Sequence, residues 1–441
     1  MQISVTATSG LERRMEIAVP AGDVQREIDS RLKRLSRTAR LKGFRPGKVP
    51  FTVVRQQFGD QVRAEVVGDL MRSTFAEAVT KENLTPAAGP RIEPLTVDPG
   101  ADLKYAAVFE VMPEVKLKPL ETVAVERPTA SIEESDIDAM IESMRRQRAQ
   151  FAPVERPAGA ADRVTVDYDG RIAGEPFEGS EGRDVSFIIG SGRVIPELEA
   201  AVTGAAAGEQ RTASVSYPES HANKSLAGKT AAFSVAVKRV EEQSLPAIDE
   251  EFCSAFGVEQ GGTEALRAEV RRSMQRELDD LVRSRLRAQV MDALYRDNPL
   301  ELPRALVSDA LVKLQVDTAQ RTGAREVSQL PPREVFEEPA RRRVALGVIL
   351  GEIIRAGGIE VDRSQVESRL NDLAERYPNP QEARRAYLQN PDAMRQVESA
   401  VLEDQALDVV LARARITDRP MTFKELTGFG PGGSGREEQS L

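Results

Sequence analysis

The stretch that most constrains the fold is one short run, Gly43-Phe44-Arg45-Pro46-Gly47-Lys48-Val49-Pro50. Two glycines and two prolines within eight residues exclude a helix or a central strand, so we expect an exposed, ordered loop. A helix over residues 23–40 should precede it, because apolar residues recur there at helical spacing. They are Val24, Ile28, Leu32 and Leu35. Residues 51–81 should form a second helix, broken at Gly59-Asp60. The loop therefore separates two helices.

Positive charge is concentrated on this loop and on the end of the preceding helix. From Arg31 to Lys48 there are eight basic residues and no acidic one, whereas the whole chain has a net charge of −9. Phe44 should be displayed between cations, as a side chain that stacks or inserts while the charges hold phosphates. These features indicate a local anionic partner. The alternative is a solvated helix end with Phe44 folded back onto its own domain.

The loop has the pattern Gly-Phe-Arg-x-Gly-Lys-x-Pro, which resembles the ribosome-binding signature of the trigger factor family of bacterial chaperones. The resemblance implies that Phe44, Arg45 and Lys48 bind the large ribosomal subunit near the exit tunnel, on both protein and rRNA. Pro46 stands where some relatives have a further basic residue, which removes one charge and stiffens the loop. The resemblance also implies a homodimer off the ribosome.

Composition limits the chemistry and the location of the protein. The 441 residues suffice for about two to four domains. The single cysteine, Cys253, excludes an internal disulfide and should be a buried apolar residue, and the single histidine, His221, excludes His-rich metal sites. We expect no metal and no cofactor. The N-terminus lacks the pattern of a secretory signal, and the apolar patch at residues 344–354 is too short to span a bilayer, so we expect a cytoplasmic protein without membrane contact.

The first 112 residues should form a compact α+β domain. Residues 3–8 and 13–19 alternate apolar and polar side chains on either side of a Ser-Gly turn, which predicts a β-hairpin. Residues 92–97 and 103–111 predict two more strands, which complete the domain with the two helices. Residues 113–155 should be a linker and a connecting helix. In that helix we expect Ser131 as the N-cap and Glu134 as its partner in a capping box.

Residues 156–242 have a different pattern, that of an antiparallel β domain. Strands are predicted at residues 164–168, 185–189, 211–217 and 230–240, and Pro196 should open one short helix. The aromatic residues on one face of these strands are either core or the wall of an apolar cup. Gly190-Ser-Gly192 is a weak nucleotide-binding signal, because Ile195 stands where a third glycine would be needed.

Four motifs of this region resemble those of FKBP-type peptidyl-prolyl isomerases: Val166-Asp-Tyr168-Asp-Gly170, Phe177-Glu178-Gly179, Phe187-Ile-Ile-Gly190 and Gly192-Arg-Val194-Ile195-Pro196. The resemblance implies a pocket formed by Tyr168, Phe177, Glu178, Phe187, Val194, Ile195, Leu198, Tyr217, His221 and Phe233. Leu198 stands where many members have a large aromatic residue, and His221 where trigger factors often have tyrosine. These departures imply a shallower pocket and a weaker isomerase activity.

Residues 243–428 should be helical. Helices are predicted at residues 263–296, 304–320, 332–355, 363–376 and 391–413. The pattern alone leaves open an ordinary helical bundle or coiled coil. The family resemblance implies an all-α chaperone domain with arms, whose small apolar patches hold nascent and unfolded polypeptides. Residues 416–426 resemble the family's return strand, and residues 429–441 are expected to be a disordered tail.

The sequence therefore predicts an α+β multidomain protein with an N-terminal α+β ribosome-binding domain, an FKBP-like antiparallel β domain with one short helix, and the all-α domain with arms. Its function would be that of an ATP-independent, ribosome-associated chaperone that isomerises X-Pro bonds, since no Walker-type loop is present. The residues alone leave two alternative functions open. One is a free-standing prolyl isomerase with a helical dimerisation region, and the other is an RNA-binding regulator that uses the basic tip.

Overall fold

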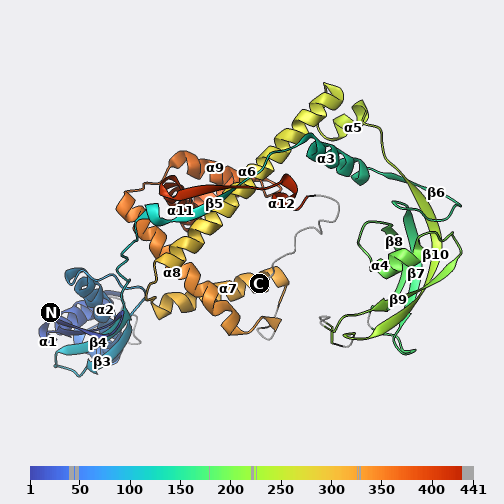
Figure 1. Ribbon diagram of the computed structural model, residues 1–441. Coiled ribbons are helices and arrows are strands. Elements are labelled where there is room, and N and C mark those ends of the chain that lie inside the picture. Colours follow the sequence, from blue (N-terminus) through green and yellow to red (C-terminus); the bar gives the residue numbers. More distant parts are fainter. Residues whose placement is uncertain are drawn as a thin grey trace. The chain divides into compact units, whose positions relative to one another are not determined.

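A computed structural model describes residues 1–38, 44, 49–177, 179–219, 223–224, 226–324, 326 and 329–429 (Figure 1). The chain divides into two compact units. The first unit combines Met1–Glu126 with Leu286–Thr417, and the second combines Arg127–Arg285 with the chain from Asp418 onward. The multidomain α+β class predicted from the sequence is confirmed. The expected tail lies almost wholly outside the described residues.

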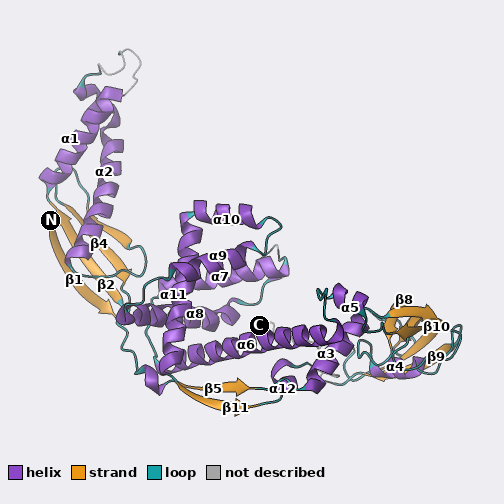
Figure 2. Ribbon diagram, turned by 90° about the horizontal axis from the view of Figure 1, so that it is seen from above, coloured by secondary structure: helices purple, strands orange, loops and turns teal. Residues whose placement is uncertain are grey.

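The first part of unit one is a four-stranded antiparallel sheet packed against two helices. The elements are β1 (Gln2–Ser9), β2 (Glu12–Val19), α1 (Ala21–Thr38), α2 (Phe51–Lys81), β3 (Arg91–Thr96) and β4 (Leu103–Glu110). The strand order is β1-β2-β4-β3. Figure 2 shows α1 and α2 side by side, extending away from the sheet. The predicted hairpin, both further strands and the first helix are confirmed.

The core of this part follows from the two periodicities of its sequence. Alternate residues of β2, from Met15 to Val19, are buried, and α1 buries Val24, Ile28 and Leu32. The predicted break at Gly59-Asp60 is wrong, because α2 is one helix from Phe51 to Lys81. Its buried valines continue on both sides of the glycine, and this burial outweighs the ~1 kcal/mol that glycine costs within a helix.

One tyrosine joins the sheet to α2 by buried hydrogen bonds. Tyr105 on β4 is 0% exposed, and its hydroxyl donates to the carbonyl of Met71 at 2.9 Å. The hydroxyl also lies 2.7 Å from Thr74 Oγ1. Burial raises the pKa of Tyr105, so the phenol stays protonated and remains a donor.

The second part of unit one is helical. Its elements are η1 (Leu120–Thr122), the end of α6 (Gly262–Asp297), α7 (Arg304–Thr322), α8 (Arg333–Gly357), α9 (Arg363–Ala374), α10 (Pro380–Gln389) and α11 (Pro391–Arg413). The five predicted helices are confirmed. Helix α10 is not among the predicted helices. Asn379 caps it by accepting a hydrogen bond from the amide of Glu382.

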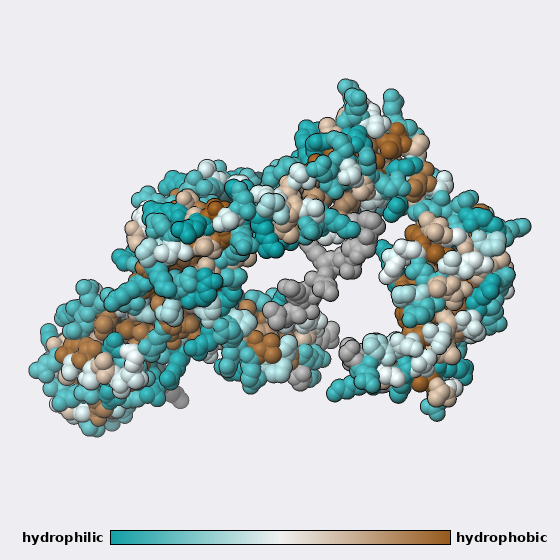
Figure 3. All heavy atoms as spheres, in the orientation of Figure 1, coloured by the Kyte–Doolittle hydropathy of each residue, from teal (hydrophilic) through white to brown (hydrophobic). Residues whose placement is uncertain are grey.

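Several apolar side chains of these helices are exposed. The most exposed are Val312, Val316, Val335, Tyr377 and Leu388. In Figure 3 apolar atoms appear as small patches within a hydrophilic surface. This pattern agrees with the scattered apolar patches expected from the sequence.

Unit two begins with a connecting segment that the sequence predicts only in part. Its elements are the end of β5 (Ala124–Thr129), α3 (Glu134–Gln147), α5 (Glu250–Ala255), the start of α6, the end of β11 (Arg415–Pro420) and α12 (Phe423–Thr427). β5 pairs with β11, so the stretch expected as a linker contains a strand. The predicted cap is also wrong. Glu133 is the N-cap of α3 and forms a capping box with Asp136, while Ser131 only donates to Glu133.

The rest of unit two is the antiparallel β domain. Its elements are β6 (Gln150–Pro153), β7 (Arg163–Arg171), β8 (Glu181–Ile188), α4 (Pro196–Val202), β9 (Gln210–Ser216) and β10 (Thr230–Ser244). The sheet order is β6-β10-β7-β8, and β9 pairs with β10. Figure 1 shows α4 within the curve of this sheet, where it contacts β9 and β10. The predicted strands and the short helix are confirmed.

Two expectations about single features can be compared with the described residues. Cys253 on α5 is buried among apolar side chains, as predicted. Within the described ranges, no helix combines the length and the apolar character needed to cross a membrane.

The Tyr105 contact gives a prediction about stability. Tyr105→Phe should destabilise the first part of unit one by about 0.5–1.5 kcal/mol, because it removes the buried hydrogen bonds of the phenol, while the Thr74 hydroxyl keeps its bond to the Leu70 carbonyl. Hydrogen exchange of α2 amides should become faster by a corresponding factor. Ser73→Ala is the matched control, since Ser73 makes only an exposed bond to Leu70. Equal exchange in Tyr105→Phe and wild type would contradict the assigned role.

Candidate functional site

The β domain gathers the described pocket candidates into one apolar cluster. Three of them are buried and five are partly buried at its edge. The buried ones are Phe187, Leu198 and Phe233, and the partly buried ones are Tyr168, Phe177, Val194, Ile195 and Tyr217. Glu178 and His221 lie outside the described residues. The cluster thus has a buried floor and a partly exposed rim.

Aromatic rings meet edge to face around Phe233. This residue comes from β10, is 3% exposed, and has its ring centroid 6.1 Å from that of Tyr168 and 6.0 Å from that of Phe177. Phe177 in turn lies 6.5 Å from Tyr217. Edge-to-face contacts of this kind stabilise a fixed arrangement of rings. The wall of the cluster is therefore set by ring orientation.

Helix α4 closes the floor of the cluster. Pro196 stands at its first turn, where its missing N–H costs nothing, and Leu198 and Val202 are buried beneath the sheet. The Glu199 carboxylate accepts a hydrogen bond from the amide of Gly190, which ties the helix to the loop that follows β8. Val194 and Ile195 precede the helix directly, so this tie also fixes their place at the rim.

Polar atoms are sparse among the described candidates. Only Tyr168 and Tyr217 carry one in the side chain. Burial raises the pKa of Tyr217, and the charge of Glu197 raises it further, so the phenol remains protonated at neutral pH. Beside Phe177 there is an open hollow of about 1000 Å³, lined also by Ile172, Glu175 and Lys229. The arrangement can bind an apolar segment, and two phenol hydroxyls are the polar side-chain groups among its described candidates.

Two features of this cluster are not among those predicted from the sequence. Ile172 directly follows β7, packs against the cluster and continues the alternation of Tyr168 and Gly170, so period-two counting could have identified it. Gly182 lies directly opposite Tyr168 in the pairing of β7 with β8. The strand pattern gives no signal for that pairing, because the register shifts between Val166 and Tyr168.

The second predicted site is the tip next to α1 and α2. Phe44 is 41% exposed, and Arg45 and Lys48 lie outside the described residues. Part of the basic run is paired with acidic residues that the sequence pattern does not connect to it. Arg31 lies 3.6 Å from Asp69, and Arg34 lies 3.2 Å from Glu27. The local positive charge is therefore smaller than the count of basic residues indicates.

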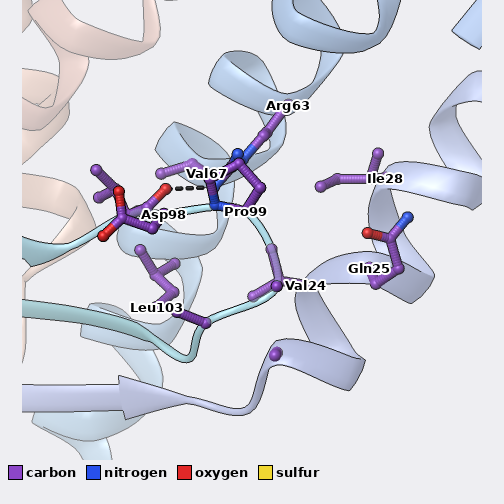
Figure 4. Close-up of a pocket in the computed structure, with 12 residues that line it drawn as sticks. Val24, Gln25, Ile28, Arg63, Val67, Asp98, Pro99 and Leu103 are labelled. Atoms are coloured by element: carbon purple, nitrogen blue, oxygen red, sulfur yellow. Dashed lines mark hydrogen bonds between the residues drawn. The ribbon is translucent and has the colours of Figure 1, made fainter.

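A small groove lies between α1, α2 and the loop after β3 (Figure 4). It has an empty volume of about 390 Å³ and is lined by apolar residues such as Val24, Ile28 and Val67. The Arg63 guanidinium donates to the carbonyl of Val97 and so ties the loop to α2. None of the predicted site residues lines this groove. As for metals, the described residues contain no group of three His, Cys, Asp or Glu side chains that could hold an ion.

Two ion pairs brace the β domain away from the aromatic cluster. The Asp162 side chain is 4% exposed. Its carboxylate accepts a hydrogen bond from Arg156 Nη2 at 3.0 Å and another from the amide of Gly159 at 2.7 Å. Glu241 forms two bonds of 2.8 Å with Arg163. The Arg156 hydrogen bond holds the pKa of Asp162 below its usual value, and the Arg163 hydrogen bond does the same for the pKa of Glu241.

Comparison with known protein families divides the chain into three matched regions. Residues 1–144 match the family described as bacterial trigger factor protein, and residues 263–412 match the C-terminus of the same family. Residues 154–238 match FKBP-type peptidyl-prolyl cis-trans isomerase, the region that contains the aromatic cluster.

Curated relatives match over nearly the whole chain. The trigger factor of Ectopseudomonas mendocina is 40% identical over 425 residues, with 96% of this chain and 98% of the relative covered. That of Thioalkalivibrio sulfidiphilus is 42% identical, with 97% and 98% covered. A solved structure, described as "Promiscuous Substrate Recognition in Folding and Assembly Activities of the Trigger Factor Chaperone", matches with a TM-score of 0.51 at 18% identity. It covers 93% of this chain and 99% of that one, and it supports the fold.

The two ion pairs predict how stability of the β domain depends on pH. Folding lowers the pKa values of Asp162 and Glu241. Their contribution to the free energy of unfolding is therefore complete above the pKa values of the unfolded chain, about 4, and is lost as pH falls through the lower pKa values of the folded protein. Urea midpoints followed by near-UV circular dichroism should therefore decrease below about pH 5. Asp162→Asn should lower the midpoint at pH 7 and flatten this decrease. A wild-type midpoint that stays constant from pH 7 to pH 3 would contradict the assignment.

Proposed function

The chain belongs to the bacterial trigger factor family, and from that premise we propose which residues carry its two activities. Family membership makes the protein a ribosome-associated chaperone with a peptidyl-prolyl isomerase domain. We assign ribosome docking to the tip that carries Phe44, Arg45 and Lys48. We assign isomerisation to the aromatic cluster of the β domain. The free-standing isomerase and the RNA-binding regulator are not favoured.

The isomerase assignment depends chiefly on one observation. Eight described candidates converge on one cluster with an accessible rim: five come from the four sequence motifs, and the others are Leu198 of α4, Tyr217 directly after β9 and Phe233 of β10. An ordinary core would bury these aromatic rings, whereas Tyr168, Phe177 and Tyr217 stay partly exposed. Such a rim can receive a proline ring and the apolar residue before it. The hollow beside Phe177 would accept the neighbouring residues of the chain.

The reaction needs shape more than reactive groups. Rotation about an X-Pro bond meets a barrier of about 18–20 kcal/mol, which amide resonance imposes. An apolar pocket weakens that resonance, because the charge-separated planar amide loses solvation there, while the twisted form loses less. Binding the twisted form more tightly than the planar form lowers the barrier. The protonated hydroxyl of Tyr217 is suited to donate a hydrogen bond to the substrate carbonyl.

The docking assignment combines exposure with charge. Phe44 is a large apolar side chain at a surface position beside two helices, and Lys33 and Arg37 on α1 are basic. An aromatic ring between cations can stack on a base or enter an apolar gap while the charges bind phosphate, so we propose contacts with both ribosomal protein and rRNA. Exposed apolar patches on α7, α8 and α10 would hold nascent chains by burial and mass action. We also propose a homodimer off the ribosome, on the ground of the family resemblance.

The proposed division of labour follows the chain. We propose a ribosome-binding domain at residues 1–112, a connecting segment at 113–155, an isomerase domain at 156–242, a helical chaperone domain at 243–428 and a tail at 429–441. The family models match residues 1–144, 154–238 and 263–412, so the first match extends beyond residue 112 into the proposed connecting segment. Expression of the individual segments and measurement of their cooperative unfolding would test the limits.

Loss of the Phe177 ring should impair isomerisation selectively. Phe177→Ala removes edge-to-face contacts with Phe233 and Tyr217 and opens the rim to water, so kcat/KM should fall by about 10–100-fold. A protease-coupled assay on a tetrapeptide with a Leu-Pro bond measures this change. Co-sedimentation with ribosomes should remain at the wild-type level. Unchanged kcat/KM in a folded variant would refute the assignment of the pocket.

Changes at the tip should have the opposite effect. The double variant Phe44→Ala, Arg45→Ala should lose co-sedimentation with ribosomes, because it removes both the stacking side chain and a phosphate-binding charge, while kcat/KM on the tetrapeptide stays unchanged. Wild-type binding should weaken as salt rises. Lys116→Ala, which removes a charge outside the tip, is the control. Retention of the double variant on ribosomes would show that docking uses another surface.

A further inference from the structure

A glycine lies beneath the ring of Tyr168 at the edge of the proposed pocket. Gly182 on β8 is the direct pairing partner of Tyr168 on β7. A Cβ atom at Gly182 would lie 2.6 Å from Tyr168 Cζ and 2.9 Å from its hydroxyl oxygen, closer than real Cβ atoms approach other atoms. The backbone of Gly182 is outside the left-handed region, so its conformation does not demand glycine. Glycine is required at this position because the Tyr168 ring occupies the space that a side chain would need.

A second ring of the cluster lies on glycine in the same way. A Cβ atom at Gly170 would lie 2.7 Å from Phe233 Cδ1 and 2.8 Å from its Cζ. The two rings are neighbours, with centroids 6.1 Å apart. Both rings therefore lie where a side chain of the adjacent strand would otherwise be. Any side chain at Gly182 would push the Tyr168 ring away from β8.

A β-bulge brings Gly182 to this position. Val166 pairs with Val185, but Tyr168 pairs with Gly182, so two residues of β8 lie opposite the single residue Asp167. Without the bulge, regular antiparallel pairing from Val185 would put Arg183 opposite Tyr168. The position of Gly182 beneath the Tyr168 ring therefore depends on the extra residue in β8.

Charged groups outside the cluster hold the bulge in place. Asp184 has a φ of 54°, a conformation unusual for a residue other than glycine, and its amide donates to Asp167 Oδ1 at 2.7 Å. Lys238 Nζ on β10 lies 2.7 Å from Asp184 Oδ1 and 3.2 Å from Asp167 Oδ2. Three strands thus converge on the bulge through Asp167, Asp184 and Lys238.

We propose that Gly182 is a positioning residue of the isomerase, which sets the place of the Tyr168 ring and thereby the width of the pocket. The inference rests on the proposed pocket. Because the pocket acts by shape, a displaced ring would change binding of the twisted X-Pro bond without removing any reactive group. Gly182 itself touches no substrate and acts through Tyr168.

The test is a double-mutant cycle in the full-length protein. Gly182→Ala should lower kcat/KM on a Leu-Pro tetrapeptide by about 10–100-fold. In the background of Tyr168→Val, whose side chain is too short to reach the added methyl group, Gly182→Ala should cause no further loss. Gly159→Ala is the matched control, since a Cβ atom there has only ordinary contacts at 3.6 Å. Near-UV circular dichroism and the thermal midpoint show whether each variant folds.

The outcomes separate this inference from the proposed function. If Tyr168→Val lowers kcat/KM and Gly182→Ala then costs nothing more, Gly182 acts through the ring. If Gly182→Ala lowers kcat/KM equally in both backgrounds, or leaves the wild-type value unchanged, the positioning role is refuted while the pocket stands. If Tyr168→Val leaves kcat/KM unchanged, the pocket assignment fails and the inference fails with it. Should Gly182→Ala not fold while Gly182→Ala, Tyr168→Val does, the clash with the ring is demonstrated directly.

Discussion

The pairing of β10 is the constraint on which the isomerase domain depends. This strand of 15 residues pairs with β6, β7 and β9 at once. Its pairing with β7 places Phe233 in the pocket floor and, beyond an irregularity between Val237 and Arg239, places Glu241 opposite Arg163. Lys238, at that irregularity, contacts the bulge of β8. The buried residues alternate from Ala231 to Val237, and the phase changes at Lys238 and Arg239, so that Val240 continues the apolar face. The strand can therefore supply an apolar floor on one face and the Glu241 carboxylate on the other.

The two proposed sites differ in what the fold must provide. The isomerase pocket needs rings held in fixed orientations, and it lies on a sheet whose edges are braced by ion pairs. The docking tip needs exposure, and it adjoins two helices whose own stability comes from the buried seam of Val54, Val62 and Val66 and from the Tyr105 contacts. Each site lies within one unit, so changes at one site need not disturb the other.

The sequence predicts those features that local periodicity determines. The four strands of the first sheet, β7 to β10 of the second, the helix opened by Pro196 and the common face of Tyr168, Phe187 and Phe233 follow from spacing alone, whereas β5 and β6 lie in the stretch expected as a linker and connecting helix. The failures come from tertiary effects. Burial on both sides of Gly59 keeps α2 continuous, and acidic residues of α2 pair with Arg31. The bulge at Asp184 shifts the register of β8 by one residue, and period-two counting from Val185 cannot reveal it.

A pocket built in this way makes backbone register as important as the identity of its polar groups. Among the described candidates only two tyrosine hydroxyls are polar, so the rate must depend on how closely the rings fit the twisted bond. Leu198, smaller than an aromatic residue, forms part of the buried floor and leaves more of that fit to the surrounding rings. The charged residues that hold the bulge are outside the apolar cluster, where they can pair without entering the site of reaction. In the proposed pocket, charge would therefore contribute to catalysis through the geometry of the sheet, and the apolar groups would act on the substrate directly.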